Sequence, residues 1–595
     1  MNRIEQNIKV ALVNAFEFHF QYAISLDEVL LQQTRKEIVG DFTINVFPFV
    51  RFAKRKPEEI AELLGAFIVE NVEQVSAFNV IKGFLNIEVL DAYWLEFLKD
   101  AYQQGKYGFK IADENSDPVV IEYSSPNTNK PLHLGHIRNN LLGFSIAEIL
   151  KADGKNVKKV NLVNDRGIHI CKSMLAWQRY GNQETPDSAA TKGDHLVGKY
   201  YVKFDQEYKV EISQLMAEGK TEAEAKKLAP IIIEAQQMLV DWEARNPQVY
   251  QLWKTMNDWV YKGFDVTYKR LGVDFDKIYY ESETYLLGKE IVEKGFLNKV
   301  LYQSEDGAIW ADLTEEGLDQ KLLLRADGTS VYMTQDIGTA QLRNEDYHPS
   351  VMLYVVGNEQ IYHFDVLKII LKKLGFDWSE KIHHISYGMV ELPHGKMKSR
   401  EGTVVDADDL IEEIVDNAAK VTTELGKIEG LPKEQAQKLF NQIGLGALKF
   451  FILKVDPKKK MLFNPEESID FNGNTGPFVQ YSHARIMSII RKSEEMEFDT
   501  WASHITINDK EKSLIKLIYN YPEVIKNAAD NYSPAMIAGY AFDLSKEYNQ
   551  FYHDNTILKE EDRVQAAFRL DLSELTAKII RSSMSLLGIE VPNQM

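Results

Sequence analysis

The sequence predicts three domains, of which the central one is an α/β domain built on a parallel sheet. Four strand-like runs, at residues 119–125, 157–164, 351–357 and 383–390, alternate with helical segments. Such alternation is typical of a parallel sheet wound with helices. The residues before this region mix helix-like and strand-like patterns, and those after it are almost wholly helical. A chain of 595 residues is long enough for roughly two to four domains.

The expected domain bounds follow these changes of pattern. Residues 1–112 combine amphipathic helical stretches with β-like ones such as 78–90, which predicts a compact α+β domain. Residues 113–459 form the expected α/β domain, interrupted at about 175–265 by long, charged helical material that indicates an insertion. Residues 460–595 have helical hydrophobic spacing and predict an all-α C-terminal domain.

The composition indicates an ordinary globular protein of a reducing compartment. The chain is 45% hydrophobic and 26% charged, and it has no apolar run long enough to cross a bilayer. Its N-terminus is polar and does not resemble a secretory signal. The single cysteine, Cys171, excludes an intramolecular disulfide and any Cys-rich zinc site. We therefore expect a cytoplasmic protein, and nothing in the sequence requires more than a monomer.

The charge balance bears on possible nucleic-acid binding. The formal net charge is −19, from 69 basic and 88 acidic residues, which argues against indiscriminate binding to nucleic acid. Local basic clusters do occur, at residues 54–56 and 458–460. The ordinary interpretation of such a triplet is a solvated surface.

Residues 119–143 have the pattern of a phosphate-binding strand–turn–helix unit. A β-like run ends in the polar turn SSPNTNKP and leads into a helix, whose free N–H groups and dipole favour an anion. Pro131 suits the first helical turn, and His133 and His136, three residues apart, share one helical face. A histidine pair at a helix start can equally be structural.

Two common nucleotide motifs are absent. No GxGxxG occurs anywhere in the chain, which excludes the dinucleotide fingerprint. The stretch GDHLVGKY at 193–200 has P-loop spacing, but Tyr200 stands where a magnesium-binding hydroxyl is needed. Because no apolar strand precedes Gly193 either, we interpret this stretch as structural.

The segment PLHLGH resembles the HIGH signature of class I aminoacyl-tRNA synthetases, here residues 133–136. A second stretch, residues 396–400 (KMKSR), resembles the KMSKS loop of the same class and follows His136 by 260 residues (396 − 136). Either stretch alone is weak, since the second could be a solvated basic turn. Together, in this order and on an α/β pattern, they favour a synthetase.

Further stretches resemble the arginyl-tRNA synthetases within this class. These stretches are EYSSPNTNKPLHLGHIR (122–138), VYMTQDIGTA (331–340), YVVGNEQIYHF (354–364), FNGNTGPFVQYSHARI (471–486) and SSMSLLGIEVP (582–592). The second and third of these stretches match two strands that the family places at the centre of its substrate pocket. The resemblance spans almost the whole chain. It implies a Rossmann-like catalytic domain between an N-terminal tRNA-binding domain and a C-terminal anticodon-binding domain.

The resemblance also implies catalytic and ATP-binding residues. It implies that His133 and His136 donate hydrogen bonds to phosphate oxygens and that Gly135 lets adenine approach the helix backbone. His363 is expected on the ATP side or, equally, as a core histidine. The loop residues expected to contact ATP are Lys396, Met397 and Ser399.

Ser399 occupies the loop position that is usually lysine. Because charge develops on the departing pyrophosphate, we expect Lys130 and Lys396 to share the cationic role, with Arg400 a weaker candidate. Mg²⁺ is expected with the ATP phosphates, and no metal bound by the protein alone is expected.

The implied pocket suits a planar guanidinium. The resemblance assigns Asp336 and Glu122 to that group with help from the hydroxyl of Tyr332. It places Asn127 and Gln360 at the α-amino end and His133 near the carboxylate. The alternatives are a helix N-cap for Asp336 and strand packing for Tyr332.

The tRNA-binding residues are implied in the two outer domains. Phe84 and Asn86 fall where the family contacts the D-loop, although Phe84 could instead belong to the core. Candidates on the anticodon side are Gln480, Tyr481, His483, Arg485 and Met595. Residues 54–56 could contact phosphates.

The sequence thus favours an enzyme that joins L-arginine to tRNA(Arg) through an arginyl-adenylate, releasing AMP and pyrophosphate. The family implies that adenylation waits for bound tRNA and that no editing domain exists. Its partners would be tRNA(Arg), L-arginine and ATP, with no membrane. One rival is a class I synthetase for another amino acid, for which a neutral residue at 122 or 336 is expected. The other is a non-catalytic tRNA-binding paralogue, for which loss of His133, His136 or Lys396 is expected.

Overall fold

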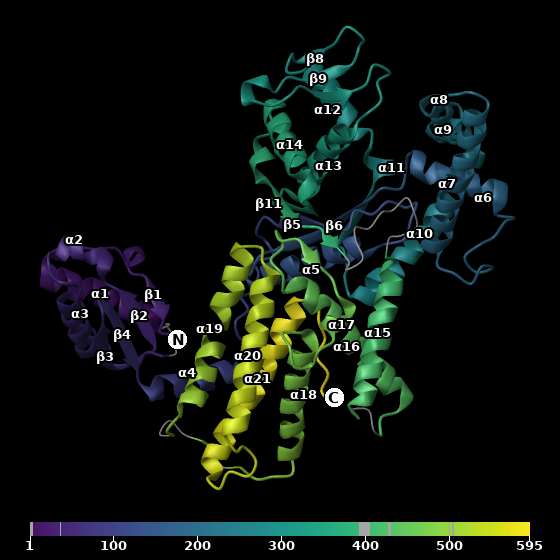
Figure 1. Cartoon of the computed structure of the whole chain (residues 1–595). Helices are drawn as coiled ribbons and strands as arrows, with labels where there is room; N and C mark the ends of the chain where they lie inside the picture. The colour runs from purple at the N-terminus through teal and green to yellow at the C-terminus, as the bar shows by residue number, and fades with distance from the viewer. Residues whose placement is uncertain (1–3, 36, 392–404, 427–429, 499, 502–504) are drawn as a thin grey trace. The chain divides into compact units, whose positions relative to one another are not determined.

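The computed structural model describes residues 4–35, 37–391, 405–426, 430–498, 500–501 and 505–595 (Figure 1). The chain forms two compact units. The first unit consists of Met1–Tyr107, Ile486–Tyr521 and Lys546–Ile579, and the second of Gly108–Arg485, Pro522–Ser545 and Ile580–Met595. The C-terminal helices therefore contribute to both units, and the sequential domain bounds stay a prediction.

The second unit is built on a five-stranded sheet. In chain order its strands are β5 (Val119–Glu122), β6 (Val157–Val163), β7 (Lys277–Tyr280), β11 (Val351–Gly357) and β12 (Ile382–Tyr387). Their spatial order is β12-β11-β5-β6-β7, and each neighbouring pair is parallel, which confirms the predicted parallel α/β sheet. The chain leaves β5 toward β6 and returns later as β11 on the other side of β5. Ligands of open α/β sheets bind at such a reversal, beyond the carboxyl ends of the strands.

Three helices flank the strands that meet at this reversal in the chain: one follows β5, one precedes β11 and one follows β11. They are α5 (Leu134–Ala152), α13 (Tyr332–Tyr347) and α14 (Ile361–Lys373). The prediction of a strand at 331–340 is wrong, because Met333, Ile337 and Ala340 are buried at helical spacing. The stretch 354–364 contains only the end of β11, followed by a 3₁₀ turn and the start of α14.

Helix α13 makes backbone contact with α12 (Leu287–Leu297) through two glycines. A Cβ atom on Gly288 would lie 1.7 Å from the Thr334 carbonyl oxygen. A Cβ atom on Gly338 would lie 2.3 Å from the Gly288 nitrogen. The two helices can therefore touch only where both residues lack side chains, and this contact fixes the position of α13.

The insertion is helical, as predicted. It contains α6 (Ile168–Tyr180), α7 (Gly193–Ala217), α8 (Glu222–Leu228), α9 (Pro230–Glu243) and α10 (Pro247–Leu271). The P-loop-like stretch forms the first turns of α7 and not a loop after a strand, which confirms its structural interpretation.

The first unit contains a four-stranded antiparallel sheet of order β1-β2-β4-β3. Its elements before residue 108 include α1 (Ile4–Phe20), β1 (Leu31–Gln33), β2 (Phe42–Asn45), α3 (Pro57–Asn71), β3 (Val75–Ile81), β4 (Phe84–Val89) and α4 (Asp91–Gln103). The hairpin β3–β4 is the β-like stretch expected at 78–90. The mixed α+β character predicted for this region is confirmed.

Beyond residue 404 the described chain is almost entirely helical. The long helices are α15 (Ala407–Glu424), α16 (Lys433–Leu453), α18 (Gly476–Ser493), α19 (Asp509–Asp530), α20 (Pro534–Asp554) and α21 (Arg563–Leu586). A short strand, β14 (Met461–Leu462), pairs in parallel with β13 (Val390–Glu391). Among the described residues, no helix is both long and apolar enough to span a bilayer.

The contact between α12 and α13 leads to a stability prediction. Replacing Gly288 with Ala should reduce the free energy of unfolding by about 2 kcal/mol or more, because the methyl group would overlap backbone atoms of α13. Gly539, inside α20, has no atom within 4 Å of its added Cβ, so Gly539→Ala should instead stabilise by about 0.5–1 kcal/mol. Urea unfolding followed by circular dichroism measures both changes. Equal stability of the two variants would contradict the close contact.

Candidate active site

The chain leaves β5 through two consecutive residues with left-handed backbone conformation. Ser124 has φ 80° and Ser125 has φ 47°, a costly conformation for residues with side chains. The Ser124 N–H donates to Asn139 Oδ1 at 2.5 Å, and the Ser125 N–H donates to Asn161 Oδ1 at 2.9 Å. Both asparagines are buried, so they hold the strained turn from the interior. Such strain is concentrated at functional sites.

Residues 132–136, here called the histidine turn, form the N-terminus of α5. His133 is the N-cap, and its Nδ1 accepts a hydrogen bond from the Gly135 N–H at 3.1 Å. His136 Nδ1 accepts from the His133 N–H at 3.2 Å, and the ring centroids are 3.9 Å apart. Since each Nδ1 accepts a backbone hydrogen bond, the proton of each neutral ring is on Nε2. Helix α5 begins at Leu134, so the expectation that Pro131 lies in its first turn is wrong.

The surroundings of the histidine turn keep both imidazoles neutral at pH 7. Burial, with a contribution from the Lys130 charge, lowers the pKa of His133 to about 4. Burial also lowers the pKa of His136 well below its usual value, helped by His133 and Lys130. The pKa of the Lys130 ammonium is itself lowered by burial. The turn therefore presents neutral Nε2–H donors next to a single lysine.

The residues that follow position 404 pair with the histidine turn. The Leu134 N–H donates to the Val405 carbonyl at 3.2 Å, and the Ala407 N–H donates to the Leu132 carbonyl at 3.0 Å. His133 and Asp406 form the antiparallel bridge between them.

Four candidate loop residues lie outside the described residues. They are Lys396, Met397, Ser399 and Arg400.

Two polar residues on the buried face of α5 join the histidine turn to the neighbouring strands. Arg138 is 0% exposed, and its guanidinium donates to the carbonyls of Pro457 at 3.1 Å and Lys459 at 2.9 Å. Asn139 Nδ2 donates to the Val355 carbonyl, at the end of β11, at 2.7 Å. The sequence analysis missed both residues, although polar side chains on an otherwise apolar helix face were a usable signal.

Glu122, at the end of β5, already has a guanidinium partner. It is 7% exposed and forms an ion pair with Arg343, which is 1% exposed and lies on α13. Its other oxygen accepts from the Ser125 hydroxyl at 2.9 Å. Glu122 was expected to contact the substrate guanidinium, and in the structure both of its oxygens have partners. The sequence analysis did not identify Arg343.

Asp336 is the more accessible of the two expected carboxylates. It lies one turn inside α13, whose N-cap is Val331, so the N-cap alternative is wrong. Its side chain is 36% exposed, and its Oδ2 is 2.5 Å from Nε2 of His363. The structure therefore pairs His363 with Asp336. Tyr332, four residues before Asp336 on the same helix face, is 77% exposed, which excludes strand packing.

The hydroxyl of Tyr354 is buried near these acidic groups and has no hydrogen-bond partner among the described residues. Burial raises the pKa of Tyr354 to about 12, and the charges of Arg343, Glu122 and Asp336 all act on it. Tyr354 lies in the middle of β11, opposite Glu122 of β5 in the sheet register.

A further carboxylate, Glu281, is close to Asp336. Burial, with smaller contributions from the charges of Asp165 and Asp336, raises its pKa to about 7 against the opposing charge of Arg166. Glu281 is thus able to hold a proton near neutral pH, and sequence reasoning gave no signal for it. Asn127 and Gln360, the residues expected at the α-amino end, are both exposed, and Asn127 bridges Asn164 beyond the end of β6.

Of the two residues expected to contact the D-loop, one is accessible. Phe84 is 40% exposed and its ring lies 5.8 Å from that of Phe47, so the core alternative is wrong. Asn86 is 0% exposed; its amide donates to Asn79 at 2.9 Å and accepts from Thr43 at 2.7 Å. The expectation that Asn86 contacts a base is therefore wrong, because its hydrogen bonds are used inside the sheet. Residues 54–56 are exposed.

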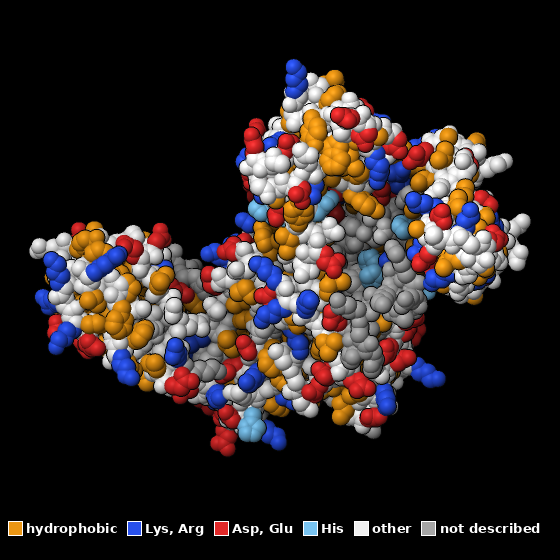
Figure 2. Space-filling model, turned by 45° about the horizontal axis from the view of Figure 1, so that its top comes forward, with side chains coloured by type: hydrophobic (Ala, Val, Ile, Leu, Met, Phe, Trp, Pro, Cys, Tyr) orange, Lys and Arg blue, Asp and Glu red, His pale blue; other side chains and the backbone are white. Residues whose placement is uncertain are grey.

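The candidates on the anticodon side divide in the same way. Gln480 and His483 are 0% exposed, and they bond the carbonyls of Glu590 and Pro592 at 2.8 and 2.9 Å. They anchor the C-terminal tail and are not available to RNA bases, contrary to expectation. Tyr481, Arg485 and Met595 are partly exposed, and the Arg485 guanidinium lies 4.8 Å from the Tyr481 ring centre. On the face drawn in Figure 2, basic and acidic side chains are interspersed.

Three family models match the chain. The class I tRNA synthetase (R) catalytic domain matches residues 98–464. The arginyl-tRNA synthetase N-terminal domain matches residues 2–89, and the DALR anticodon-binding domain matches residues 479–595. Two solved structures share the fold over the whole chain. The arginyl-tRNA synthetase of Thermus thermophilus has a TM-score of 0.78 at 23% identity, covering 100% of both chains. That of Plasmodium falciparum has a TM-score of 0.75 at 20% identity, covering 100% of this chain and 99% of the other.

Curated relatives are similar over their full length. The arginine–tRNA ligase of Flavobacterium psychrophilum is 56% identical over 604 residues, covering 100% of this chain and 99% of the relative. That of Bacteroides thetaiotaomicron is 55% identical over 596 residues, covering 100% of both. With these matches to all three parts of the chain, and the histidine turn placed at the sheet reversal, the protein belongs to the arginyl-tRNA synthetase family of class I.

Proposed function

We propose that this site carries out the ATP-dependent ligation of L-arginine to tRNA(Arg), the activity named for the curated relatives. The arginine carboxylate would attack the α-phosphate of ATP, forming arginyl-adenylate and releasing pyrophosphate. The terminal ribose hydroxyl of tRNA would then take the arginyl group and release AMP. The observation that carries the proposal is the histidine turn of α5, which follows β5, together with the carboxylates of Glu122 on β5 and Asp336 on α13. No covalent enzyme intermediate is needed, so positioning and charge stabilisation supply the acceleration.

The histidine turn suits the phosphate side of the reaction. His133 and His136 would donate through Nε2 to α-phosphate oxygens, while Lys130 supplies the cation for the departing pyrophosphate. Gly135, at the start of α5, leaves the backbone open to adenine. Mg²⁺ would arrive bound to the ATP phosphates. Lys396, Met397 and Ser399 complete the proposed ATP site by resemblance to the family alone.

Asp336 is proposed as the principal ligand of the arginine guanidinium. It is partly exposed, so the substrate cation can reach the carboxylate. Glu122 is proposed as a second carboxylate, which Arg343 and Ser125 hold in a fixed orientation. Tyr332 shares the helix face of Asp336 and would supply a hydroxyl.

The remaining substrate contacts are proposed from exposure and residue type. Asn127 and Gln360 would bind the α-amino end, and His133 would reach the carboxylate side. The tRNA contacts proposed are Phe84, Tyr481, Arg485, Met595 and residues 54–56. Cys171 is a buried free thiol, which suits a reducing cytoplasm.

Measuring ATP–pyrophosphate exchange tests the proposed function directly. Exchange should appear with arginine, and only after tRNA(Arg) is added, because the family implies that adenylation waits for bound tRNA. Each of the other amino acids serves as a control. Exchange driven by lysine or glutamate would support a different class I specificity, and no exchange with any amino acid would support a non-catalytic protein.

The pocket assignment predicts the effect of Asp336→Asn. Removing this charge should lower kcat/KM for arginine by roughly 30- to 1,000-fold, as expected when a charged hydrogen-bonded pair loses one partner. Glu345→Gln is the matched control, because Glu345 lies on the same helix and is exposed. Its kcat/KM should stay within about twofold of the wild type. Unchanged kcat/KM in Asp336→Asn would remove Asp336 from the pocket.

The lowered pKa values of the histidine turn predict a distinctive titration. The folded-state pKa of His133 is about 4, so its imidazole should stay neutral as the pH falls from 7.5 to 5.5. His195, whose pKa is raised by its hydrogen bond to Asp408, should be protonated at pH 5.5. NMR of protein labelled at histidine Cε1 measures both, with His133→Gln and His195→Gln used to assign the signals. A His133 signal that titrates near pH 6.5 would show that the turn is not desolvated.

A further inference from the structure

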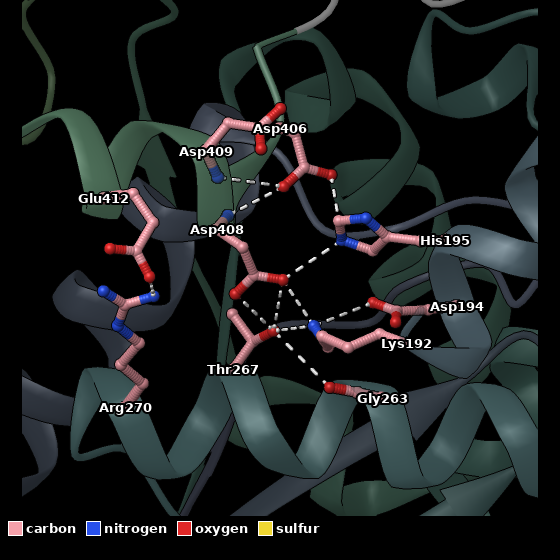
Figure 3. Close-up of polar contacts among 10 residues, drawn as sticks. All are labelled: Lys192, Asp194, His195, Gly263, Thr267, Arg270, Asp406, Asp408, Asp409 and Glu412. Atoms are coloured by element: carbon pink, nitrogen blue, oxygen red, sulfur yellow. Dashed lines mark hydrogen bonds and ion pairs between the residues drawn. The ribbon is translucent and has the colours of Figure 1, made fainter. Parts of the chain in front are cut away.

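A polar cluster connects the helical insertion to the residues that pair with the histidine turn (Figure 3). It is here called the Lys192 cluster and consists of Lys192, Asp194, His195, Thr267, Asp406 and Asp408. The Lys192 ammonium, just before α7, forms ion pairs with the carboxylates of Asp408 and, at 3.3 Å, Asp194. It also donates to the Thr267 hydroxyl, on α10, at 2.7 Å. One lysine thus joins α7, α10 and the start of α15.

Close packing of α7 against α10 in the insertion buries one acidic residue of this cluster, Asp194. Asp194 is 0% exposed, and a Cβ atom on Gly263 of α10 would lie 2.2 Å from its Oδ1. That oxygen has no hydrogen-bond partner among the described residues. A buried carboxylate with an unsatisfied oxygen depends on a nearby cation, and Lys192 supplies it.

A second contact in the cluster comes from His195. Its Nε2 lies 3.2 Å from the Asp408 carboxylate and 3.4 Å from that of Asp406. The ligand atoms of Asp194, His195 and Asp408 lie within 4.8 Å of one another, a spacing that could hold a metal ion. The ammonium of Lys192 already contacts both carboxylates, so we interpret the cluster as an ion-pair network and not as a metal site.

The acidic end of the cluster is fixed to the histidine turn through the backbone. Asp406 is the N-cap of α15, and its Oδ1 accepts from the Asp408 N–H at 2.8 Å. The same residue forms the bridge with His133, and its neighbours Val405 and Ala407 make the two flanking backbone hydrogen bonds. Asp408 is only two residues from Asp406, so any displacement of Asp408 would also move the backbone that pairs with the histidine turn.

We propose that Lys192 and His195 are positioning residues, which hold segment 405–408 and, through its backbone pairs, keep His133 and His136 aligned for adenylate formation. The proposal rests on the proposed function, since it assigns the histidine turn to the reaction. It gives the helical insertion a role in the chemical step without a second active site. Neither residue is among the proposed substrate contacts.

The test compares kcat and KM of ATP–pyrophosphate exchange in variants of the full chain. Lys192→Met and Asp408→Asn should each lower kcat about tenfold, as expected from a misaligned catalytic group, with KM for arginine changed less than twofold. Both substitutions remove the ion pair between Lys192 and Asp408, so the double variant should be no slower than the slower single variant. Lys192→Arg keeps the cation and should recover most of kcat, and His195→Ala should lower kcat about threefold.

Arg270→Ala is the matched control. Arg270 of α10 forms a 2.7 Å ion pair with Glu412 of α15, so it also links the insertion to α15 but lies outside segment 405–408 (Figure 3). Its kcat should stay within about twofold of the wild type. An equal loss in Arg270→Ala would overturn the proposal, because any link between the helices would then suffice.

The outcomes separate this proposal from the proposed function. Wild-type protein without arginine-dependent exchange would contradict the proposed function itself. Active wild type together with fully active Lys192→Met and Asp408→Asn variants would overturn only the positioning role. Thermal unfolding shows whether each variant is folded. If Lys192→Met is not folded, the positioning role is tested with Lys192→Arg, His195→Ala and Asp408→Asn instead. Loss of kcat in folded His195→Ala and Asp408→Asn supports the role, and full kcat in both overturns it.

Discussion

The site depends on how the N-terminus of α5 is held against the end of β5. Residues 123–133 connect the buried strand to this helix, and the connection begins with Ser124 and Ser125 in left-handed conformations. Asn139 supports that turn and also bonds the end of β11, so one amide connects the strained turn to the neighbouring strand. Arg138 adds bonds to the chain at 457–459. The strained conformation of Ser124 and Ser125 is stable because several buried hydrogen bonds hold it.

Two opposite electrostatic environments meet at the sheet reversal. Burial keeps His133 and His136 neutral, so the phosphate side offers hydrogen-bond donors and leaves the positive charge to Lys130. The other side collects carboxylates, of which Asp336 is the accessible one and Glu122 is balanced by Arg343. A site with this division can reject neutral amino acids, since they would leave buried charges without a partner.

The helical insertion is linked to this centre by charge as well as by packing. Gly193 and Gly263 let α7 and α10 approach closely: a Cβ on Gly193 would lie 2.1 Å from the Trp259 carbonyl. This close packing buries Asp194 and leaves Lys192 as the cation that balances it. The same ammonium reaches Asp408, beside the segment that pairs with the histidine turn. The insertion thereby helps to position the histidine turn without supplying a residue that binds substrate.

The sequence by itself determined what depends on local pattern. Alternating strand and helix signals are properties of short segments, so the parallel sheet, the helical insertion and the strand–turn–helix unit carrying His133 and His136 could all be read directly. The strand expected at 331–340 came from the family resemblance and not from the local pattern, and in α13 the buried side chains follow helical spacing.

Only the tertiary structure decided which side chains are accessible and which already have ion-pair or hydrogen-bond partners within the protein. Glu122 meets Arg343, more than two hundred residues away, and Gln480 meets the carbonyl of Glu590 (343 − 122 = 221; 590 − 480 = 110). The amide of Asn86 bonds Asn79 on the adjacent hairpin strand and Thr43 on β2, which is more distant in sequence. Burial and hydrogen-bond pairing are set by contacts between remote segments, which leave no trace in local periodicity. The residue types of the site could therefore be predicted, but their partners and accessibility could not.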